Sequence, residues 1–368
     1  MKKQNATLQD IASAAGVSLA TAHLVLAQKP GPKTETRERV LHIARSLDYH
    51  CNSVASSLKR GTTRIVAVLP AATARGTLFH EPIWNGVRAY CDYVKDFHME
   101  LIEIPYVNPD SISVPLEAVE RIQSLDKISG MIVPGDIEND AKAALRDLTN
   151  REIPLVLVNS DAPETGRFCC VQANNYLLGK VMGEILCSHI ADGSGILVCA
   201  GYPNTPANYQ SVRGIEDFFR GRGLCPKIIK IHHKDNMNAL YQALREQFST
   251  GTIGGCCSVT ARGSVQLAHA LQEEGLAGKL SAIGSDLFSE NIRNIKNGTF
   301  QYLMFKNPYQ QGWLAAEQLF KYIFHRQRPG NSESYVKGEV IFQSSVSLYE
   351  SELEQLEDTM EVRAAANR

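Results

Sequence analysis

The stretch TLQDIASAAGVSLATAHLVL, residues 7–26, decides how the amino-terminal part of the chain folds. Apolar residues recur at helical spacing on both sides of Gly16, which predicts one helix before this glycine and a second over 19–27. Thr7 and Ser18 can cap these helices, because a hydroxyl oxygen accepts the backbone N–H groups that a helix start leaves unpaired. Gly16 suits the tight turn, since glycine adopts a positive φ without steric cost. Two helices joined by such a short turn are typical of a helix-turn-helix.

The residues that follow predict a third helix and then a connector. Over about 34–48 the apolar residues again recur at helical spacing. In the connector, Asn52 to Lys59 could form one or two helical turns, and a helix this short is marginal alone in water. The segment 1–60 carries nine Lys or Arg and four Asp or Glu, a balance of +5, whereas the rest of the chain has a balance of −6. A basic head on an acidic body suggests that the head alone meets a polyanion.

From residue 64 onward the pattern changes to short apolar runs separated by amphipathic helices. We expect ten strands, at Ile65–Leu69, Met99–Ile104, Met131–Val133, Leu155–Val158, Ile196–Cys199, Ile228–Ile231, Gly254–Val259, Ser281–Gly284, Gln301–Phe305 and Glu339–Phe342. Runs of Val, Ile and Leu that alternate with helices are typical of parallel sheets covered on both faces. Ten strands exceed one comfortable sheet, so we expect two doubly wound subdomains. Ligands of such sheets bind beyond the carboxyl ends of the strands, here in a cleft between the two.

Length and composition exclude several classes of protein. The chain has 368 residues, too many for one typical domain, and its 44% hydrophobic and 21% charged content is ordinary for a globular protein. No apolar run reaches about 18 residues, which excludes a membrane-spanning helix. The basic start of the chain lacks the apolar segment of a secretory signal, so we expect a cytoplasmic protein with no membrane partner.

The cysteines and the motif content argue against metal sites and catalysis. Nine cysteines include the pairs Cys169-Cys170 and Cys256-Cys257, which lie in runs predicted as buried strands. No zinc-site spacing occurs, and no serine-nucleophile, zinc-protease, phosphate-loop or dinucleotide motif. We therefore expect no metal, no cofactor and no catalytic residue. The cysteines are predicted to be reduced hydrophobic side chains, with redox sensing as the alternative.

The amino-terminal segment 1–63 resembles the lactose-repressor (LacI) family of bacterial transcription regulators. The matching segments are Thr7–Ala12, Ala15–Ser18, Thr21, Thr36–Val40, Leu47–Tyr49, Asn52–Ala55 and Leu58, in order and without gaps. The resemblance implies a homodimer that binds double-stranded DNA at a pseudo-palindromic operator. The second helix would read the major groove, and the connector would form a hinge helix whose leucine enters the minor groove. The residues assigned to DNA are Thr7, Ser18, Leu19, Ala20, Thr21, His23, Arg37, Asn52, Ala55, Leu58 and Lys59.

The second helix departs from the family pattern where bases are read. Leu24 stands where the family usually has arginine, His23 where it has serine, and Ala27 where it has asparagine. Arginine on guanine is the commonest specific base contact. We therefore expect either an atypical operator or base reading by a few polar groups such as Ser18, Thr21 and His23. For His23, a surface histidine without a contact is the alternative.

Residues 64–350 resemble the ribose-type periplasmic sugar-binding fold that the LacI family uses as its sensor. The likeness rests on Ile153–Pro163, Asn174-Asn175 with Gly179, Ile283–Asp286, Asn297–Thr299 and Asn307–Gly312. It implies an all-α head with a hinge helix, followed by an α/β core of two doubly wound parallel-sheet subdomains of the type I periplasmic-binding-protein kind. The expected domains are a DNA-binding head at 1–50, a hinge at 51–63, an effector-binding and dimerisation core at 64–350, and a charged tail at 351–368. Within the core, the N-subdomain is expected at 64–162 and 307–328, and the C-subdomain at 163–306 and 329–350.

The resemblance implies a small sugar or sugar-like effector in the cleft of this core. Carried over by position, the effector residues are Phe79, His80, Asn159, Asn208, Tyr209, Asp286 and Lys306. Asp286 could accept two sugar hydroxyls, and such charge-assisted hydrogen bonds are strong. Lys306 raises the alternative of a phosphorylated or acidic sugar. Asp286 could instead cap a helix, Lys306 could be a solvated rim lysine, and Phe79 and His80 could be misaligned.

Together these expectations describe a transcription regulator, with repression as the expected mode, whose operator affinity is set by an effector. An enzyme and a periplasmic sugar receptor are the rival classes, and the basic head argues against both, because the core fold alone does not decide function. The effector could release DNA or act as a corepressor. Either mode requires it to bind two conformations unequally, and the sequence leaves the sign open.

Overall fold

The computed structural model describes residues 8–26, 31–47, 62–71, 77–108, 112–191, 193–233 and 236–350. The chain divides into two compact units, Met1–Gly61 and Thr62–Arg368, which we call the head and the core. The following expected features lie outside the described residues: Thr7, the side chain of His23, the hinge residues Asn52, Ala55, Leu58 and Lys59, and the tail at 351–368.

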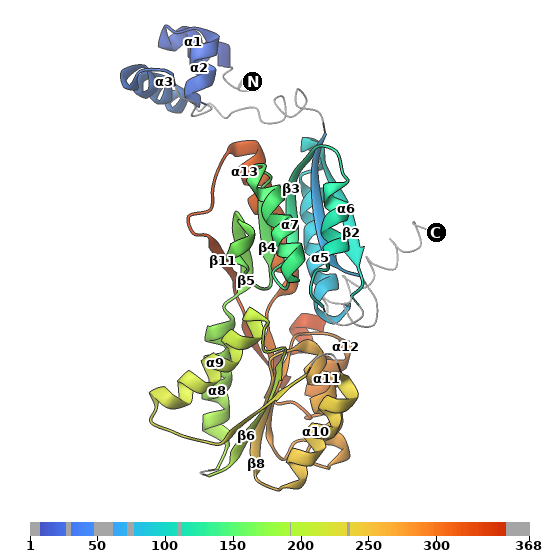
Figure 1. The fold of residues 1–368 in the computed structure, drawn as a ribbon. Helices are drawn as coiled ribbons and strands as arrows, with labels where there is room; N and C mark the ends of the chain where they lie inside the picture. The colour runs from blue at the N-terminus through green and yellow to red at the C-terminus, as the bar shows by residue number, and fades with distance from the viewer. Residues whose placement is uncertain are drawn as a thin grey trace. The chain divides into compact units, whose positions relative to one another are not determined.

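The described part of the head consists of three helices, α1 (Leu8–Ala15), α2 (Leu19–Leu26) and α3 (Thr34–Ser46) (Figure 1). Gly16 turns the chain between α1 and α2 with a φ of +63°. Ser18 Oγ accepts the backbone N–H of Thr21 at 3.1 Å and so caps α2 as predicted. The helices pack around a small apolar core made of Ile11, Ala15, Val25, Val40 and Ala44. The predicted helix-turn-helix is therefore present, and α3 ends two residues earlier than expected.

The first sheet of the core has six parallel strands in the order β11-β5-β4-β3-β1-β2. Its strands are β1 (Thr63–Pro70), β2 (Met99–Tyr106), β3 (Ile128–Pro134), β4 (Leu155–Val158), β5 (Cys169–Ala173) and β11 (Glu333–Val336). Its helices are α5 (Thr77–Tyr93), α6 (Leu116–Gln123), α7 (Asn139–Asn150) and α13 (Pro308–His325). We call this sheet with its helices the first lobe.

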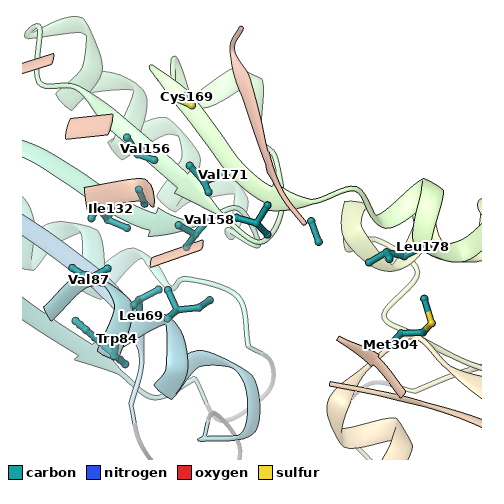
Figure 2. Close-up of a cluster of buried hydrophobic side chains, with 14 of the residues drawn as sticks. Leu69, Trp84, Val87, Ile132, Val156, Val158, Cys169, Val171, Leu178 and Met304 are labelled. Atoms are coloured by element: carbon teal, nitrogen blue, oxygen red, sulfur yellow. The ribbon is translucent and has the colours of Figure 1, made fainter. Parts of the chain in front are cut away.

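Alternate residues of the central strands serve the two faces of this sheet. Ile65, Ala67 and Leu69 of β1 join the cluster that includes α5 and α13, and Val66 and Val68 join the cluster that includes α6 and α7. Figure 2 shows part of the first cluster, in which Trp84 and Val87 of α5 lie beside Leu69. Because both faces are covered, the central strands β1, β3 and β4 are mostly apolar, which is why the sequence shows continuous apolar runs there.

The second sheet has the strand order β12-β10-β9-β8-β6-β7, with β12 antiparallel to β10 and the other pairs parallel. Its strands are β6 (Gly195–Gly201), β7 (Ile228–His232), β8 (Ile253–Ser258), β9 (Ser281–Ser285), β10 (Tyr302–Phe305) and β12 (Glu339–Phe342). The helices are α8 (Asn175–His189), α9 (Pro206–Gly221), α10 (Met237–Ser249), α11 (Ala261–Glu273) and α12 (Ser289–Lys296). We call this sheet with its helices the second lobe.

The expected boundaries between the subdomains need a correction. They assigned both 163–306 and 329–350 to the C-subdomain, but β5 pairs with β4 and β11 pairs with β5, so both strands belong to the first sheet. The chain therefore crosses to the second lobe after Ala173 rather than before residue 163. The apolar run at Cys169–Ala173 indicates a buried strand, but it carries no sign of the sheet that the strand joins.

The described cysteines fit the hydrophobic interpretation better than redox sensing. Both vicinal pairs are fully buried, and burial raises the pKa of all four thiols above the ordinary value. A buried thiol with a raised pKa is a poor nucleophile, because the reactive species is the thiolate. Among the described residues, no helix is long and apolar enough to cross a membrane.

Candidate functional site

A cavity of the core lies where strands of both sheets end. The first lobe lines it with Phe79, His80, Ile112, Asp136 and Asn159. The second lobe lines it with Gly201, Tyr202, Thr205, Ala207, Asn208, His233, Val259, Thr260, Ala261, Arg262, Asp286 and Lys306. Seven of these residues stand at or just after the carboxyl end of a strand, as parallel α/β sheets place their ligand residues: Asp136, Asn159, Gly201, His233, Val259, Asp286 and Lys306.

Asp286 is held rigidly in the wall of this cavity. It follows β9 with a φ of +69°, a left-handed conformation that aspartate tolerates better than most residues. The Asn291 side chain donates to the carbonyls of Ser285 and Asp286 at 2.8 and 2.9 Å and so fixes this turn. The residue that caps the next helix, α12, is Phe288, so Asp286 is not the cap that the alternative interpretation proposed.

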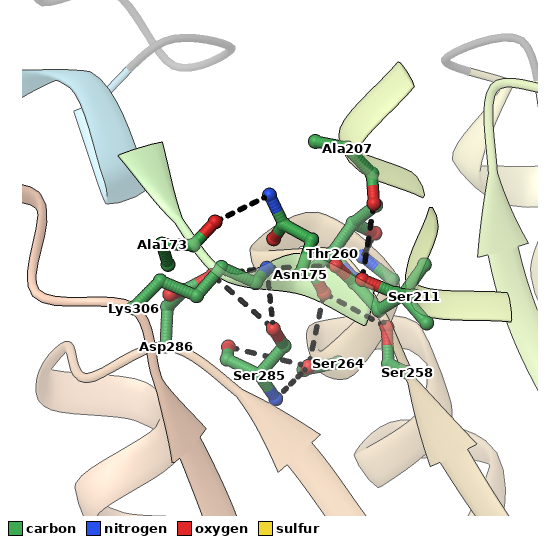
Figure 3. Close-up of polar contacts among 12 residues, drawn as sticks. Ala173, Asn175, Ala207, Ser211, Ser258, Thr260, Ser264, Ser285, Asp286 and Lys306 are labelled. Atoms are coloured by element: carbon green, nitrogen blue, oxygen red, sulfur yellow. Dashed lines mark hydrogen bonds and ion pairs between the residues drawn. The ribbon is translucent and has the colours of Figure 1, made fainter. Parts of the chain in front are cut away.

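Lys306 forms a buried ion pair with Asp286. Its Nζ lies 3.2 Å from Asp286 Oδ2, and the two side chains are 9% and 2% exposed (Figure 3). The same ammonium donates to Val259 O at 2.8 Å and to Ser285 Oγ at 2.9 Å. A lysine ammonium has three donors, so these contacts use all of them. Lys306 is therefore an internal counter-ion of the wall and not a solvated rim lysine.

The second carboxylate oxygen of Asp286 is left available. Asp286 Oδ1 is buried and has no hydrogen-bond partner among the described residues. A buried charged acceptor without a partner is costly, and a donor that enters the cavity would remove the cost. The wall of the cavity therefore contains one buried carboxylate oxygen whose hydrogen-bonding capacity is not used by the described residues.

Asp136 of the first lobe reaches a residue of the second lobe. Its carboxylate accepts a hydrogen bond from Ser160 Oγ at 3.5 Å, and the Thr205 hydroxyl also stabilises its charged form. Thr205 stands at the start of α9, yet its side chain does not cap that helix, which leaves the hydroxyl for Asp136. Burial raises the pKa of Asp136 to about 6, although the two hydroxyls and Lys142 act in the other direction.

His233 lines the second-lobe side of the cavity as a neutral imidazole. Burial, together with the charges of Arg262 and His232, lowers the pKa of His233 to about 4. Its Nε2 lies 3.5 Å from Thr260 Oγ1, and its Nδ1 has no partner among the described residues. Nδ1 is therefore a second polar atom that a ligand could satisfy.

The cavity brings together six of the seven residues expected at the effector site, which are Phe79, His80, Asn159, Asn208, Asp286 and Lys306. Tyr209 is not among the residues that line the cavity, and its side chain is 56% exposed. Asn208 already faces the cavity from α9, and the next residue of a helix points about 100° away. Sequence reasoning missed Asp136, Thr205 and His233. For Asp136 and His233 a usable signal exists, since Asp136 is the first ionisable residue after the expected strand Met131–Val133, and His233 is the second after the expected strand Ile228–Ile231.

The described head residues expected to contact DNA lie mainly on its surface. Ser18, Leu19 and Ala20 are exposed or partly exposed at the start of α2, and Thr21 and Arg37 are partly exposed. Arg39 donates from Nε to Ala15 O at 3.1 Å, which ties α3 to the end of α1. The start of α2 is therefore accessible and held in place by the rest of the head.

Two family models match the chain. Residues 7–52 match the lacI family of bacterial regulatory proteins, and residues 73–327 match the periplasmic binding protein domain. The HTH-type transcriptional repressor PurR of Vibrio cholerae serotype O1 (strain M66-2) is 29% identical over 201 residues, which cover 53% of this chain and 56% of the relative. The chain thus spans little more than half the length of this curated relative.

Solved structures share the fold of the core. The glucose-galactose binding protein GanP of Geobacillus stearothermophilus matches with a TM-score of 0.66 at 19% identity, over 77% of this chain and 98% of that one. A protein described as a LacI transcriptional regulator from Bacteroides fragilis matches with a TM-score of 0.68 at 14% identity, over 78% and 100%. At these identities the likeness concerns the fold alone. The chain belongs to the family of periplasmic binding protein domains, and its head is a domain of the lacI family of bacterial regulatory proteins.

Proposed function

We propose that the protein is a DNA-binding transcription regulator, expected to repress, whose affinity for an operator is set by a small ligand in the core cavity. The observation that carries this proposal is the joining, in one chain, of a capped helix-turn-helix with a core whose cavity holds an unpartnered buried acceptor. The head would contact DNA and the core would bind the ligand. The proposed partner, chromosomal DNA, implies a cytoplasmic location, and the proposed role is binding rather than catalysis.

We further propose that the protein acts as a homodimer. Two heads related by a two-fold axis would read the two halves of a pseudo-palindromic operator. Analytical ultracentrifugation of the full chain, with and without duplex, tests this. A monomer that binds one half-site per chain would contradict it.

The cavity favours a neutral, hydroxyl-bearing ligand, such as a sugar or polyol. Asp286 Oδ1 needs a donor, and the hydroxyls of a polyol supply one. Lys306 has no donor left for a phosphate or carboxylate, and Asp286 already balances its charge. These contacts weigh against the phosphorylated or acidic sugar.

One observation favours the phosphorylated or acidic sugar as a second candidate ligand. Arg262 lines the cavity at the start of α11, where the helix dipole adds to its positive charge. A thermal-shift screen of the full chain would separate the two classes, with neutral sugars and polyols in one arm and sugar phosphates in the other. A ligand at about 100 times its dissociation constant should add roughly 2.7 kcal/mol of stability. Stabilisation by the phosphates alone would overturn the neutral assignment.

The decisive experiment for DNA binding is selection from a random duplex library by the full-length protein. The enriched duplex is then titrated by fluorescence anisotropy at several salt concentrations, with and without the ligand from the screen. We expect affinity to fall steeply with salt, because phosphate contacts release counterions. A loss of affinity on adding the ligand identifies an inducer, and a gain identifies a corepressor. No enrichment of any duplex would refute the proposed function.

A further inference from the structure

Several of the described side chains on the outward surface of α2 are apolar. Leu19 is 48% exposed, Ala20 is exposed, and Leu24 is partly buried. Ala20 and Leu24 are four residues apart and share one face of the helix. Ala22, on the other side, is fully buried against the rest of the head. Among the described side chains, Leu19, Ala20 and Leu24 are therefore the aliphatic groups of α2 that could approach a partner.

The hydroxyls at the start of α2 are already engaged within the head. Ser18 Oγ accepts the Thr21 N–H at 3.1 Å and lies 2.8 Å from Thr21 Oγ1, so the two side chains bond to each other and to the helix start. Part of their hydrogen-bonding capacity is used by the cap. The Ser18 and Thr21 hydroxyls are thus less available for hydrogen bonds to base edges than two free hydroxyls would be.

We propose that Leu19, Ala20 and Leu24 read thymine through its 5-methyl group. This inference rests on the proposed function, and the partner is duplex DNA because the segment 1–60 carries a balance of +5, which suits a polyanion. In the major groove the four base pairs differ by hydrogen-bond donors, by acceptors and by the thymine methyl. Aliphatic side chains cannot pair with the donors and acceptors. The methyl is the base-edge feature that they can contact favourably.

The test removes single methyl groups from the DNA. The duplex enriched by the full-length protein is resynthesised with deoxyuridine in place of one thymidine at a time, which leaves the base pairing unchanged. We expect one or two positions in each half-site at which the substitution weakens binding about fourfold, the effect of losing one buried methyl group. The other thymidines should tolerate it.

Variants of the protein then assign the contact. In Leu19→Ala the ratio of the affinities for the thymidine duplex and the deoxyuridine duplex should fall to near one at a sensitive position, because the side chain that contacts the methyl group has been removed. Leu24→Ala is expected to do the same at a neighbouring position. Leu47→Ala is the matched control, since Leu47 is 41% exposed at the end of α3, and it should keep the ratio of the wild type. Circular dichroism melting of each variant checks that the head is folded.

The outcomes separate this inference from the function beneath it. An enriched duplex that tolerates deoxyuridine at every position overturns the thymine reading while the regulator assignment stands. Sensitivity that persists unchanged in both Leu19→Ala and Leu24→Ala, with the variants folded, also overturns it. If no duplex is enriched at all, the proposed function fails and the inference fails with it.

Discussion

The two walls of the cavity hold their buried carboxylates in opposite ways. On the second lobe, Asp286 is paired with Lys306 at 3.2 Å. On the first lobe, Asp136 accepts hydrogen bonds from hydroxyls, and Lys142 acts on it as a nearby charge. The charged partner of Asp286 belongs to the same lobe, whereas the Asp136 carboxylate is stabilised in part by Thr205 of the other lobe. We infer that the second lobe presents a preformed binding surface and that Asp136 is the group most sensitive to how the two lobes meet.

The largest expected effect comes from breaking the ion pair. Asp286→Ala leaves the Lys306 ammonium buried without a counter-ion, so the free energy of unfolding should fall by about 3–5 kcal/mol. Urea denaturation of the full chain at pH 7 measures this. Asp286→Ala combined with Lys306→Met should regain most of the stability, because both charges are removed together. Neither variant should show the thermal shift that a neutral polyol gives the wild type. A single variant as stable as the wild type would mean that the pair is not buried as described.

The next effect concerns the acid of the first-lobe wall. Asp136 has a pKa of about 6 in the folded chain and an ordinary value near 3.8, so folding takes up a proton between these values. The wild type should therefore lose up to about 3 kcal/mol of stability as the pH rises through this window. Asp136→Asn should be more stable than the wild type at pH 7, and the difference should vanish below about pH 4. Urea denaturation from pH 4 to 8 provides the test, and parallel curves would contradict it.

His233 should produce the opposite slope. Its pKa is about 4 in the folded chain against an ordinary 6.5, so folding releases a proton and stability is lost as the pH falls through this range. The loss should reach up to about 3 kcal/mol at acid pH, and His233→Gln should remove it. In the wild type the two slopes oppose each other. In the same urea series, the pH slopes of Asp136→Asn and His233→Gln should therefore depart from the wild-type slope in opposite directions, and equal slopes would refute this comparison.

The smallest effect concerns the contact between the lobes. Thr205→Val removes a hydroxyl that donates to the Asp136 carboxylate, at a cost of about 1 kcal/mol. The same change should raise the pKa of Asp136 further, because a hydrogen bond to the charged form is lost. The pH range over which the protein loses stability relative to Asp136→Asn should then extend to higher pH. Thr205→Ser keeps the hydroxyl and is the matched control. A Thr205→Val protein with an unmoved window would show that the hydroxyl does not act on Asp136.

The head could be predicted largely from the sequence, because its signals are local. Ser18 caps α2 and Gly16 turns the chain, and both depend on residues within a few positions. The expected effector residues came from the resemblance to the ribose-type fold, and only Asn159, Asp286 and Lys306 also follow the end of an apolar run. The prediction for Tyr209 was wrong, although its neighbour Asn208 does line the cavity. An error of one residue along a helix such as α9 rotates the side chain by about 100°.

The pairings between distant residues could not be predicted in the same way. Lys306 reads from the sequence as a possible anion binder or rim lysine, but its role depends on Asp286, which precedes it by a strand and a helix. The strands β5 and β11 are separated by most of the second lobe in the chain, yet they pair in the first sheet. Nothing local in either run says which sheet it joins.

The ten strands expected from the sequence omitted β5 and β11. The sequence by itself determined the alternation of strands and helices in the core, the helix-turn-helix and the position of most strand ends that carry polar residues. These follow from periodicity, capping and turn chemistry, which act over a few residues. The tertiary structure alone decided that Lys306 neutralises Asp286, that Asp136 meets Thr205, and that His233 is neutral. Burial and charge pairing set these outcomes, because both depend on which parts of the chain exclude water from one another.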